Sequence, residues 1–216
     1  MLISISSRAQ SFTYLEKSGD NEYHYDYDIQ KMEGKIKIKV IRREGEHLME
    51  DQVFILNQQL HTLKWVFIRT RDNTHVTAEL KGDRVFISGI SDGDEIEDDH
   101  DLDDYPWIQL WPMNIGLEHF LNSADEEIRF WAFGTEKPGD LDLAKFVATK
   151  EEKEMIRMEG NTDVLAFRVN ITLSGWKSLF WEGDFYFRNS DKRIIKYDGG
   201  GAPGKPDSIT TLISEN

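Results

Sequence analysis

The chain has 216 residues, of which 39% are hydrophobic and 12% aromatic, so it can bury a core and is not intrinsically disordered. It contains no cysteine, which excludes disulfides and thiolate-bound metal ions. Lys and Arg number 26 against 40 Asp and Glu, and the resulting formal net charge of −14 disfavours nucleic acid and anionic lipid surfaces as partners.

The first residues contain no basic region followed by a long apolar run, so they do not have the pattern of a secretory signal. No window reaches the ~18 consecutive apolar residues that are typical of a membrane-spanning helix. We therefore expect a cytoplasmic protein with no membrane span.

Apolar and polar residues alternate through the first part of the chain, which is typical of β-strands with one buried face. Tyr25, Tyr27 and Ile29 share one face, and in residues 35–40 isoleucine and valine alternate with three lysines. We interpret these lysines as a solvated face that protects a sheet edge. Strands are predicted at residues 11–29 (one strand or a pair), 35–40, 51–56, 63–70, 75–80 and 84–88. Turn residues recur between them every ~8–12 residues, which favours a large antiparallel sheet, a sandwich or a barrel.

An acidic run follows, in which nine of the thirteen residues from Asp92 to Asp104 are Asp or Glu. Because like charges repel, we interpret residues 91–104 as an exposed loop. After the loop, apolar residues within 113–121 have helical spacing, and Pro112 suits the start of a helix. This is the one helix that we predict.

Strands are predicted again at residues 128–133, 141–149 and 154–158, with a charged turn at 150–153. From Asp163 to Leu212 we predict three consecutive hairpin-linked strands and a fourth after a glycine-rich loop. Alternation places Asp184 on the strand face opposite Trp181, and Arg168 on a neighbouring strand is its candidate ion-pair partner.

The C-terminal block also carries a longer pattern. It reads Trp181-Glu-Gly-Asp184-Phe-Tyr186-Phe187, then Asp191 to Tyr197, then a glycine-rich loop ending Pro203-Gly204-Lys205-Pro206, and a threonine-containing strand. In this pattern, over about its last quarter, the chain resembles an uncharacterised bacterial family whose fold is similar to lipoprotein carriers and lipoprotein receptors. The resemblance implies a strongly curved antiparallel sheet, an incomplete barrel, with residues 113–121 as a helix in its mouth. It also implies that an apolar molecule or a peptide segment is bound, and that no reaction is catalysed.

We therefore predict one mainly β domain over residues 1–216. It is a large curved antiparallel sheet, an incomplete barrel, of about ten to twelve strands with one short helix.

Large aromatic residues give the leading hypothesis for function. Six Trp and twelve Phe either fill a core or line a concave sheet face that accepts an apolar ligand. Trp107 and Trp111 stand next to Pro106 and Pro112 in the stretch that follows the acidic run, so we place them at the mouth of the predicted pocket. The candidate ligand-binding residues are Trp107, Trp111, Phe120, Trp131, Trp181 and Asp184.

The leading hypothesis is a non-enzymatic protein that binds an apolar small molecule, a lipid or a peptide. One alternative is an interaction protein that docks a cationic partner through the acidic loop, and another is a hydrolase-type enzyme that uses carboxylates. The histidines show no metal-ligand spacing, and no Gly-x-Ser-x-Gly motif occurs. We therefore expect no metal and no cofactor, and we assign no catalytic residue. The oligomeric state stays open.

Overall fold

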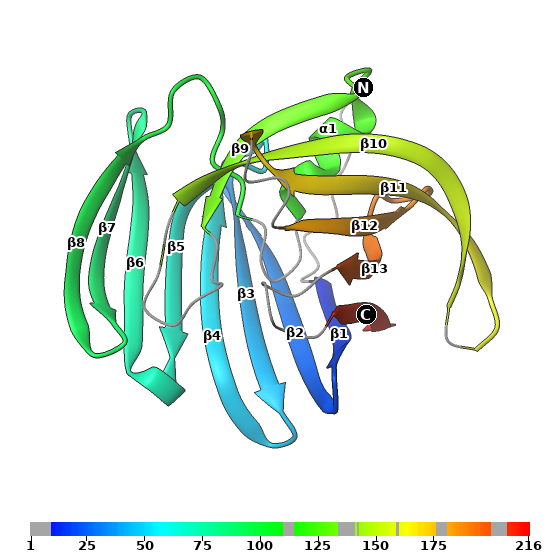
Figure 1. The fold of residues 1–216 in the computed structure, drawn as a ribbon, viewed down its shortest axis with the longest axis horizontal. Helices are drawn as coiled ribbons and strands as arrows, with labels where there is room; N and C mark the ends of the chain where they lie inside the picture. The colour runs from blue at the N-terminus through cyan, green and yellow to red at the C-terminus, as the bar shows by residue number, and fades with distance from the viewer. Residues whose placement is uncertain are drawn as a thin grey trace.

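A computed structural model describes residues 10–109, 115–133, 141, 143–158, 160–175, 181–199 and 207–216. Within these residues the strands form one antiparallel sheet of 14 strands that is not closed into a barrel. Figure 1 shows the sheet curving through the molecule, with the short helix α1 between its two groups of strands. The predicted fold class is therefore confirmed, although the sheet has more strands than the ten to twelve expected.

The first group of strands is β1 (Gln10–Ser18), β2 (Asn21–Met32), β3 (Lys35–Glu44), β4 (His47–Leu56), β5 (Thr62–Arg69), β6 (Thr74–Lys81), β7 (Arg84–Ser91) and β8 (Asp94–Asp101). The second group is β9 (Glu127–Phe133), β10 (Leu143–Arg157), β11 (Asp163–Leu173), β12 (Glu182–Arg188), β13 (Ile194–Gly199) and β14 (Ser208–Glu215). Between the groups lie a 3₁₀ turn, η2 (Ile115–Leu117), and α1 (Glu118–Asn122), and a second 3₁₀ turn, η1 (Thr70–Asp72), follows β5.

Nearly every strand pairs with its neighbours in the sequence. The order across the sheet is β8-β7-β6-β5-β4-β3-β2-β1-β14-β13-β12-β11-β10-β9. The two groups of strands therefore meet where β1 pairs with β14, and backbone hydrogen bonds of 3.0 and 3.3 Å between Ser11 and Asn216 extend that seam. The sheet is open between β8 and β9, which are its two edges.

Side chains on the buried face of the sheet form a second connection between the two groups of strands. On β5, Trp65 is 1% exposed, and its ring stacks on Phe67 and on Phe133 of β9, with 5.2 Å between ring centroids in both pairs. Trp107 packs edge-on against Phe133 at 5.7 Å. Such aromatic pairs add to the stabilisation from apolar burial alone. The core therefore connects strands that are far apart in the order of the sheet.

The edge of β9 is covered by the segment that follows β8. Trp131 donates its backbone N–H to Pro106 (2.9 Å) and accepts from the N–H of Ile108 (2.9 Å). The side-chain amide of Gln109 then accepts from the N–H of Phe133 (3.0 Å) and donates to its carbonyl (3.2 Å). One glutamine thus replaces the backbone of a missing neighbouring strand.

The prediction of an acidic loop at residues 91–104 is wrong for most of its length, because Asp94–Asp101 forms β8 and pairs with β7. An edge strand needs only one hydrogen-bonded neighbour and can keep its acidic side chains in water. Arg84 also offsets part of the repulsion, since its guanidinium binds Asp101 through two hydrogen bonds of 2.8 and 2.9 Å and pairs with Asp99.

Three smaller predictions also need correction. Residues 150–153 are not a turn but part of the continuous strand β10, which has a bulge between Lys150 and Lys153. This stretch lies beyond the β9 pairing, Lys150 and Lys153 pair with β11, and residues 151–153 are exposed, so their charges can stay in water. The lysine-rich strand, β3, lies between β2 and β4 and is not an edge. The predicted helix at 113–121 is shorter in the described part, where α1 begins at Glu118 and residues 110–114 lie outside the description.

Candidate functional site

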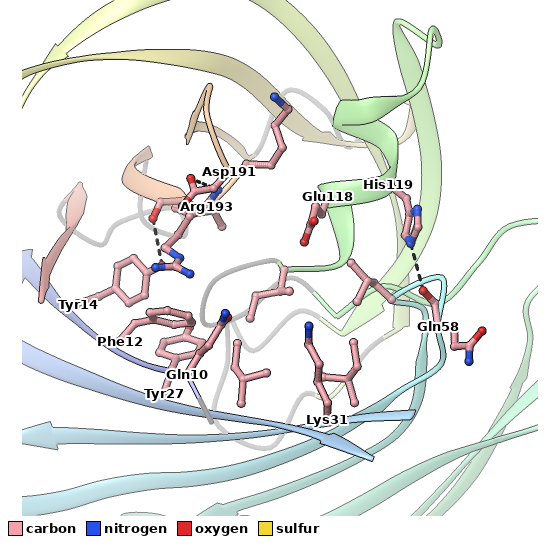
Figure 2. Close-up of a pocket in the computed structure, with 16 residues that line it drawn as sticks. Gln10, Phe12, Tyr14, Tyr27, Lys31, Gln58, Glu118, His119, Asp191 and Arg193 are labelled. Carbon is pink, nitrogen blue, oxygen red and sulfur yellow. Dashed lines mark hydrogen bonds between the residues drawn. The ribbon is translucent and has the colours of Figure 1, made fainter. Parts of the chain in front are cut away.

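A cavity of about 390 Å³ lies against the buried face of the sheet, where β1 begins and β2 ends (Figure 2). The lining residues are Gln10, Phe12, Tyr14, Tyr27, Ile29, Lys31, Ile36, Gln58, Leu60, Ile115, Glu118, His119, Asp191, Lys192, Arg193 and Ile194. They come from β1, β2 and β3, the β4–β5 loop, η2 and α1, and the β12–β13 turn with the first residue of β13. The cavity therefore lies between the sheet and the segment that crosses it.

Strand register brings the sheet side of the cavity together. Gln10 of β1 is paired with Ile29 of β2, and Phe12 is paired with Tyr27. Alternate residues of a strand face the same side of a sheet, so these four side chains form two adjacent rows. The β2–β3 pairing adds Ile36, which is opposite Lys31.

The deep part of the cavity is aromatic and buried. Phe12, Tyr14 and Tyr27 are each no more than 5% exposed, and the two tyrosine rings meet edge to face at 5.2 Å. The hydroxyl of Tyr14 donates to the carbonyl of Ile194 at 3.0 Å. Burial raises the pKa of Tyr14 well above its ordinary value, so this phenol stays neutral and keeps its donated proton at physiological pH.

One wall of the cavity is a charged network with little net charge. Arg188 donates to Asp191 (2.8 and 2.7 Å) and to Glu215 (3.0 and 2.8 Å), and Arg193 also binds Glu215. The guanidinium of Arg193 lies 3.8 Å above the ring of Phe12, as in a cation–π contact. Burial acts to raise the pKa of Asp191 and is the largest single effect, but the hydrogen bonds from the Arg188 side chain and the Arg193 backbone, together with both positive charges, outweigh it, so the pKa is lowered. The hydrogen bond from Arg188 likewise lowers the pKa of Glu215.

The open rim of the cavity is polar. His119 at the start of α1 contacts the carbonyl of Gln58 through Nε2 at 3.1 Å, and because a carbonyl only accepts, this nitrogen donates. Lys31 on β2 and Glu118 on α1 are exposed on either side of the rim. The cavity is thus apolar in its depth and charged at its opening.

A second polar cluster is buried elsewhere on the same face of the sheet. Arg42 lies between two buried carboxylates and donates to Glu16 at 3.2 Å and to Glu50 at 3.1 Å. The hydroxyl of Tyr25 donates to Glu16 at 2.5 Å, and Gln52 donates to Glu50 at 3.2 Å. Every carboxylate of the cluster is therefore hydrogen-bonded, as a buried ion requires, and none of the cluster lines the cavity.

Five of the six residues predicted from the sequence to bind a ligand are described by the structure, and none of these five lines the cavity. Trp107 is 1% exposed within the core, and Phe120 is 5% exposed beneath Lys150. Trp131 donates its indole N–H to the carbonyl of Leu102 at 2.6 Å. Their role in binding stays a prediction.

Of the other three candidates, Trp181 and Asp184 do not line the cavity either. Trp181 packs edge-on against Phe146 at 5.6 Å between centroids, and Trp111 lies outside the described residues. Asp184 accepts from Arg168 at 2.7 Å and from Asn170 at 3.0 Å, which confirms the predicted ion pair.

The sequence contained a signal for the residues that do line the cavity. Tyr27 and Ile29 share one strand face, and Phe12 and Tyr14 alternate on the preceding strand. These rows predicted a buried face but not an unfilled space above it. The space depends on the course of the segment around Ile115 and Glu118, whose helical spacing predicts a helix but not where that helix lies over the sheet.

In the part of the chain that the structure describes, no three His, Cys, Asp or Glu residues are grouped so that they could hold a metal ion. No helix among the described residues is long and apolar enough to cross a bilayer.

By its fold and its cavity, the protein belongs to the class of open, β-barrel-like sheets with an internal cavity. No family model and no curated protein matches the chain. Among solved structures it is similar to the β-barrel-like protein of the domain of unknown function DUF1849 from Brucella abortus, with a TM-score of 0.60 and 6% identity over 98% of each chain. It also matches the hypothetical lipoprotein YmcC from Escherichia coli, with a TM-score of 0.40 and 9% identity over 98% of this chain and 90% of the other. At these identities the first likeness shows a shared fold, and the second carries no further conclusion.

Proposed function

We propose that this protein is a non-enzymatic binding protein that holds the apolar chain of a small molecule or lipid in the cavity between β1–β3 and α1. The observation that carries the proposal is the cavity itself, because its depth is lined by Phe12, Tyr14 and Tyr27 and its opening is polar. Half of the sixteen lining residues are polar or charged, so the cavity is more polar than most small-molecule sites, and its buried aromatic part is the part that suits an apolar chain.

The size of the cavity supports a small ligand over a folded partner. A volume of about 390 Å³ lies in the lower part of the ~300–1,000 Å³ range of ligand sites. Each methylene group moved from water into such a site contributes about 0.8 kcal/mol, or roughly fourfold in affinity. Affinity should therefore rise with chain length and stop rising when the cavity is full.

Filling the cavity with protein atoms tests the proposal. Ile36→Trp acts from the sheet side and Ile115→Trp from the opposite side, and both residues line the cavity. Each variant should weaken binding of a fluorescent fatty acid at least tenfold, because the added ring occupies the space of the chain. The matched control is Ile209→Trp on β14, at a position that is 44% exposed, and it should bind like the parent protein.

Thermal unfolding of each variant is the folding control, and each variant should unfold near the temperature of the parent protein. Saturable binding that is unchanged in Ile36→Trp and Ile115→Trp would count against the proposal, as would no saturable binding to the parent protein. Two earlier alternatives, a cationic partner docked at the acidic segment and a carboxylate-based hydrolase, stay predictions.

A further inference from the structure

The rim of the cavity also indicates the chemical class of the ligand, and this inference rests on the function proposed above. Lys31 and Glu118 carry opposite charges and reach the rim from β2 and α1. In Figure 2 the ammonium of Lys31 and the carboxylate of Glu118 point toward one another across the cavity. Over the residues that the structure describes, their side chains form no ion pair with each other or with a third residue.

The other charged groups of the lining have partners of their own. Asp191 and Arg193 belong to the network with Arg188 and Glu215, in which two cations and two anions cancel. The ammonium of Lys192 donates to the carbonyl of Asn189 at 2.6 Å. Among the lining residues that the structure describes, Lys31 and Glu118 are therefore the two charged side chains of the rim with neither an ion pair nor a hydrogen bond of their own.

The position of this charge pair matches the polarity of an amphiphile. Along β2, Tyr27 is buried, Ile29 is half-buried and Lys31 is exposed, while along β1 the neighbouring row runs from buried Phe12 to exposed Gln10. Both rows thus change from apolar to polar toward the same end. An apolar chain bound along them would place its head between Lys31 and Glu118.

We propose that the ligand is a zwitterionic amphiphile, with an anionic group bound by Lys31 and an ammonium group bound by Glu118. A head with a single charge would satisfy one of these side chains and bring a like charge near the other. A zwitterion satisfies both with charge-assisted hydrogen bonds, which are stronger than neutral ones. The shared rim also fixes the order of the groups, with the apolar chain pointing toward Phe12 and Tyr27.

Four single-chain probes of equal chain length separate the possible heads. They are a lysophosphatidylethanolamine (zwitterionic), a fatty acid (anionic), an alkylamine (cationic) and a monoacylglycerol (neutral), each used below its micelle concentration to displace a fluorescent apolar probe. The zwitterion should displace the probe at a concentration about tenfold lower than the other three, which corresponds to about 1.4 kcal/mol.

Charge variants connect this preference to the two residues. Lys31→Glu and Glu118→Lys should each remove the advantage of the zwitterion, and Lys31→Glu combined with Glu118→Lys should restore it, since the two charges are exchanged. Lys35→Glu is the matched control, because Lys35 is exposed near the same end of the sheet but does not line the cavity. It should leave the order of the four probes unchanged.

The outcomes separate this inference from the proposed function. Equal displacement by all four probes, a consistent preference for the fatty acid or the alkylamine, or an unchanged order in Lys31→Glu would overturn the zwitterion inference and leave the cavity as an apolar site. Failure of all four probes to bind would overturn the proposed function as well.

Discussion

At the scale of single residues, Arg42 is the charge that allows two carboxylates to be buried on the inner face of the sheet. Glu16 and Glu50 are 5% and 6% exposed, and both accept hydrogen bonds from its guanidinium. Removing one partner of a buried ion pair is far more costly than removing one at the surface, because it leaves an uncompensated charge.

We expect Arg42→Leu to lower the free energy of unfolding by about 3–5 kcal/mol, as measured by urea denaturation at pH 7. Arg43→Leu is the control, since Arg43 pairs with Asp26 in a half-exposed position and should cost less than about 1 kcal/mol. Equal losses for the two arginines would contradict a structural role for the buried cluster.

The charged wall of the cavity predicts loss of stability in acid. The pKa of Glu215 is lowered from its ordinary 4.5 by the hydrogen bond from Arg188. A group with a lowered pKa in the folded state contributes stability above its unfolded pKa, and this contribution disappears as pH falls through the folded pKa. Stability from Glu215 is thus fully present at pH 7 and declines below about pH 4.5.

Glu215→Gln should therefore be less stable than the parent at pH 7, by about 1 kcal/mol after screening by solvent. The difference should shrink when urea denaturation is repeated at pH 3. Glu151→Gln, at an exposed position of β10, should show little difference at either pH. A deficit in Glu215→Gln that is the same at pH 3 and pH 7 would show that the ion pairs are not its cause.

At the scale of elements, Gln109 is the residue that ends the sheet at β9. Its side chain pairs with both backbone groups of Phe133 and is 7% exposed. Gln109→Leu keeps the approximate shape but leaves a backbone N–H and a carbonyl unpaired, at a cost of roughly 1–3 kcal/mol for each group. We expect the free energy of unfolding to fall by about 2–4 kcal/mol and the amide of Phe133 to exchange with deuterium faster.

Gln30→Leu is a control, because the side chain of Gln30 is exposed on β2 and donates only to Asp28. It should change stability by less than about 0.5 kcal/mol. If the Phe133 amide in Gln109→Leu exchanged as slowly as in the parent, the glutamine would not be what closes this edge.

The opposite edge, β8, is protected by charge. Over the described residues β8 pairs with β7 and no other strand, and Glu95, Glu97 and Asp98 are exposed along it. Acidic side chains on an unpaired edge oppose pairing between two copies of a protein. Glu95→Gln, Glu97→Gln and Asp98→Asn in one variant should therefore promote self-association, visible as larger species in sedimentation velocity.

The control for this edge variant neutralises three acidic residues in turns instead, by Asp20→Asn, Glu33→Gln and Glu46→Gln, all at exposed positions. It removes the same charge but leaves the edge acidic, so it should sediment like the parent. Equal association of the two variants would assign the effect to net charge and not to the edge of β8.

Strands were predictable from the sequence where they are determined by local residue patterns. Period-two alternation and turn residues predicted most strands, and the hairpin order from β11 to β14 is confirmed by the pairing. Asp184 and Arg168 were predictable because adjacent strands bring them together. Strand β8 was not, because its repulsion is relieved by Arg84 on another strand and by its position at an edge. The cavity was not predictable either, since alternation identifies a buried face but not where that face stays unfilled.

At the scale of the whole molecule, the sheet resembles a barrel that is open at one place, between β8 and β9. The chain forms β1 to β8, crosses the inner face through η2 and α1, and returns through β9 to β14 to pair with β1. The crossing segment contributes buried side chains such as Leu117 and Phe120 to the core. Where it passes β1–β3 it leaves the cavity, so the same crossing both stabilises the sheet and forms the proposed site.

The most direct measurement is a crystal structure of the protein with a single-chain zwitterionic lipid that carries bromine near the end of its chain. We predict an anomalous bromine peak inside the cavity, among Phe12, Tyr27 and Ile36, with the head between Lys31 and Glu118. A bromine peak on the outer face of the sheet, or an empty cavity at saturating lipid, would contradict the central claim that this space exists to hold an apolar chain.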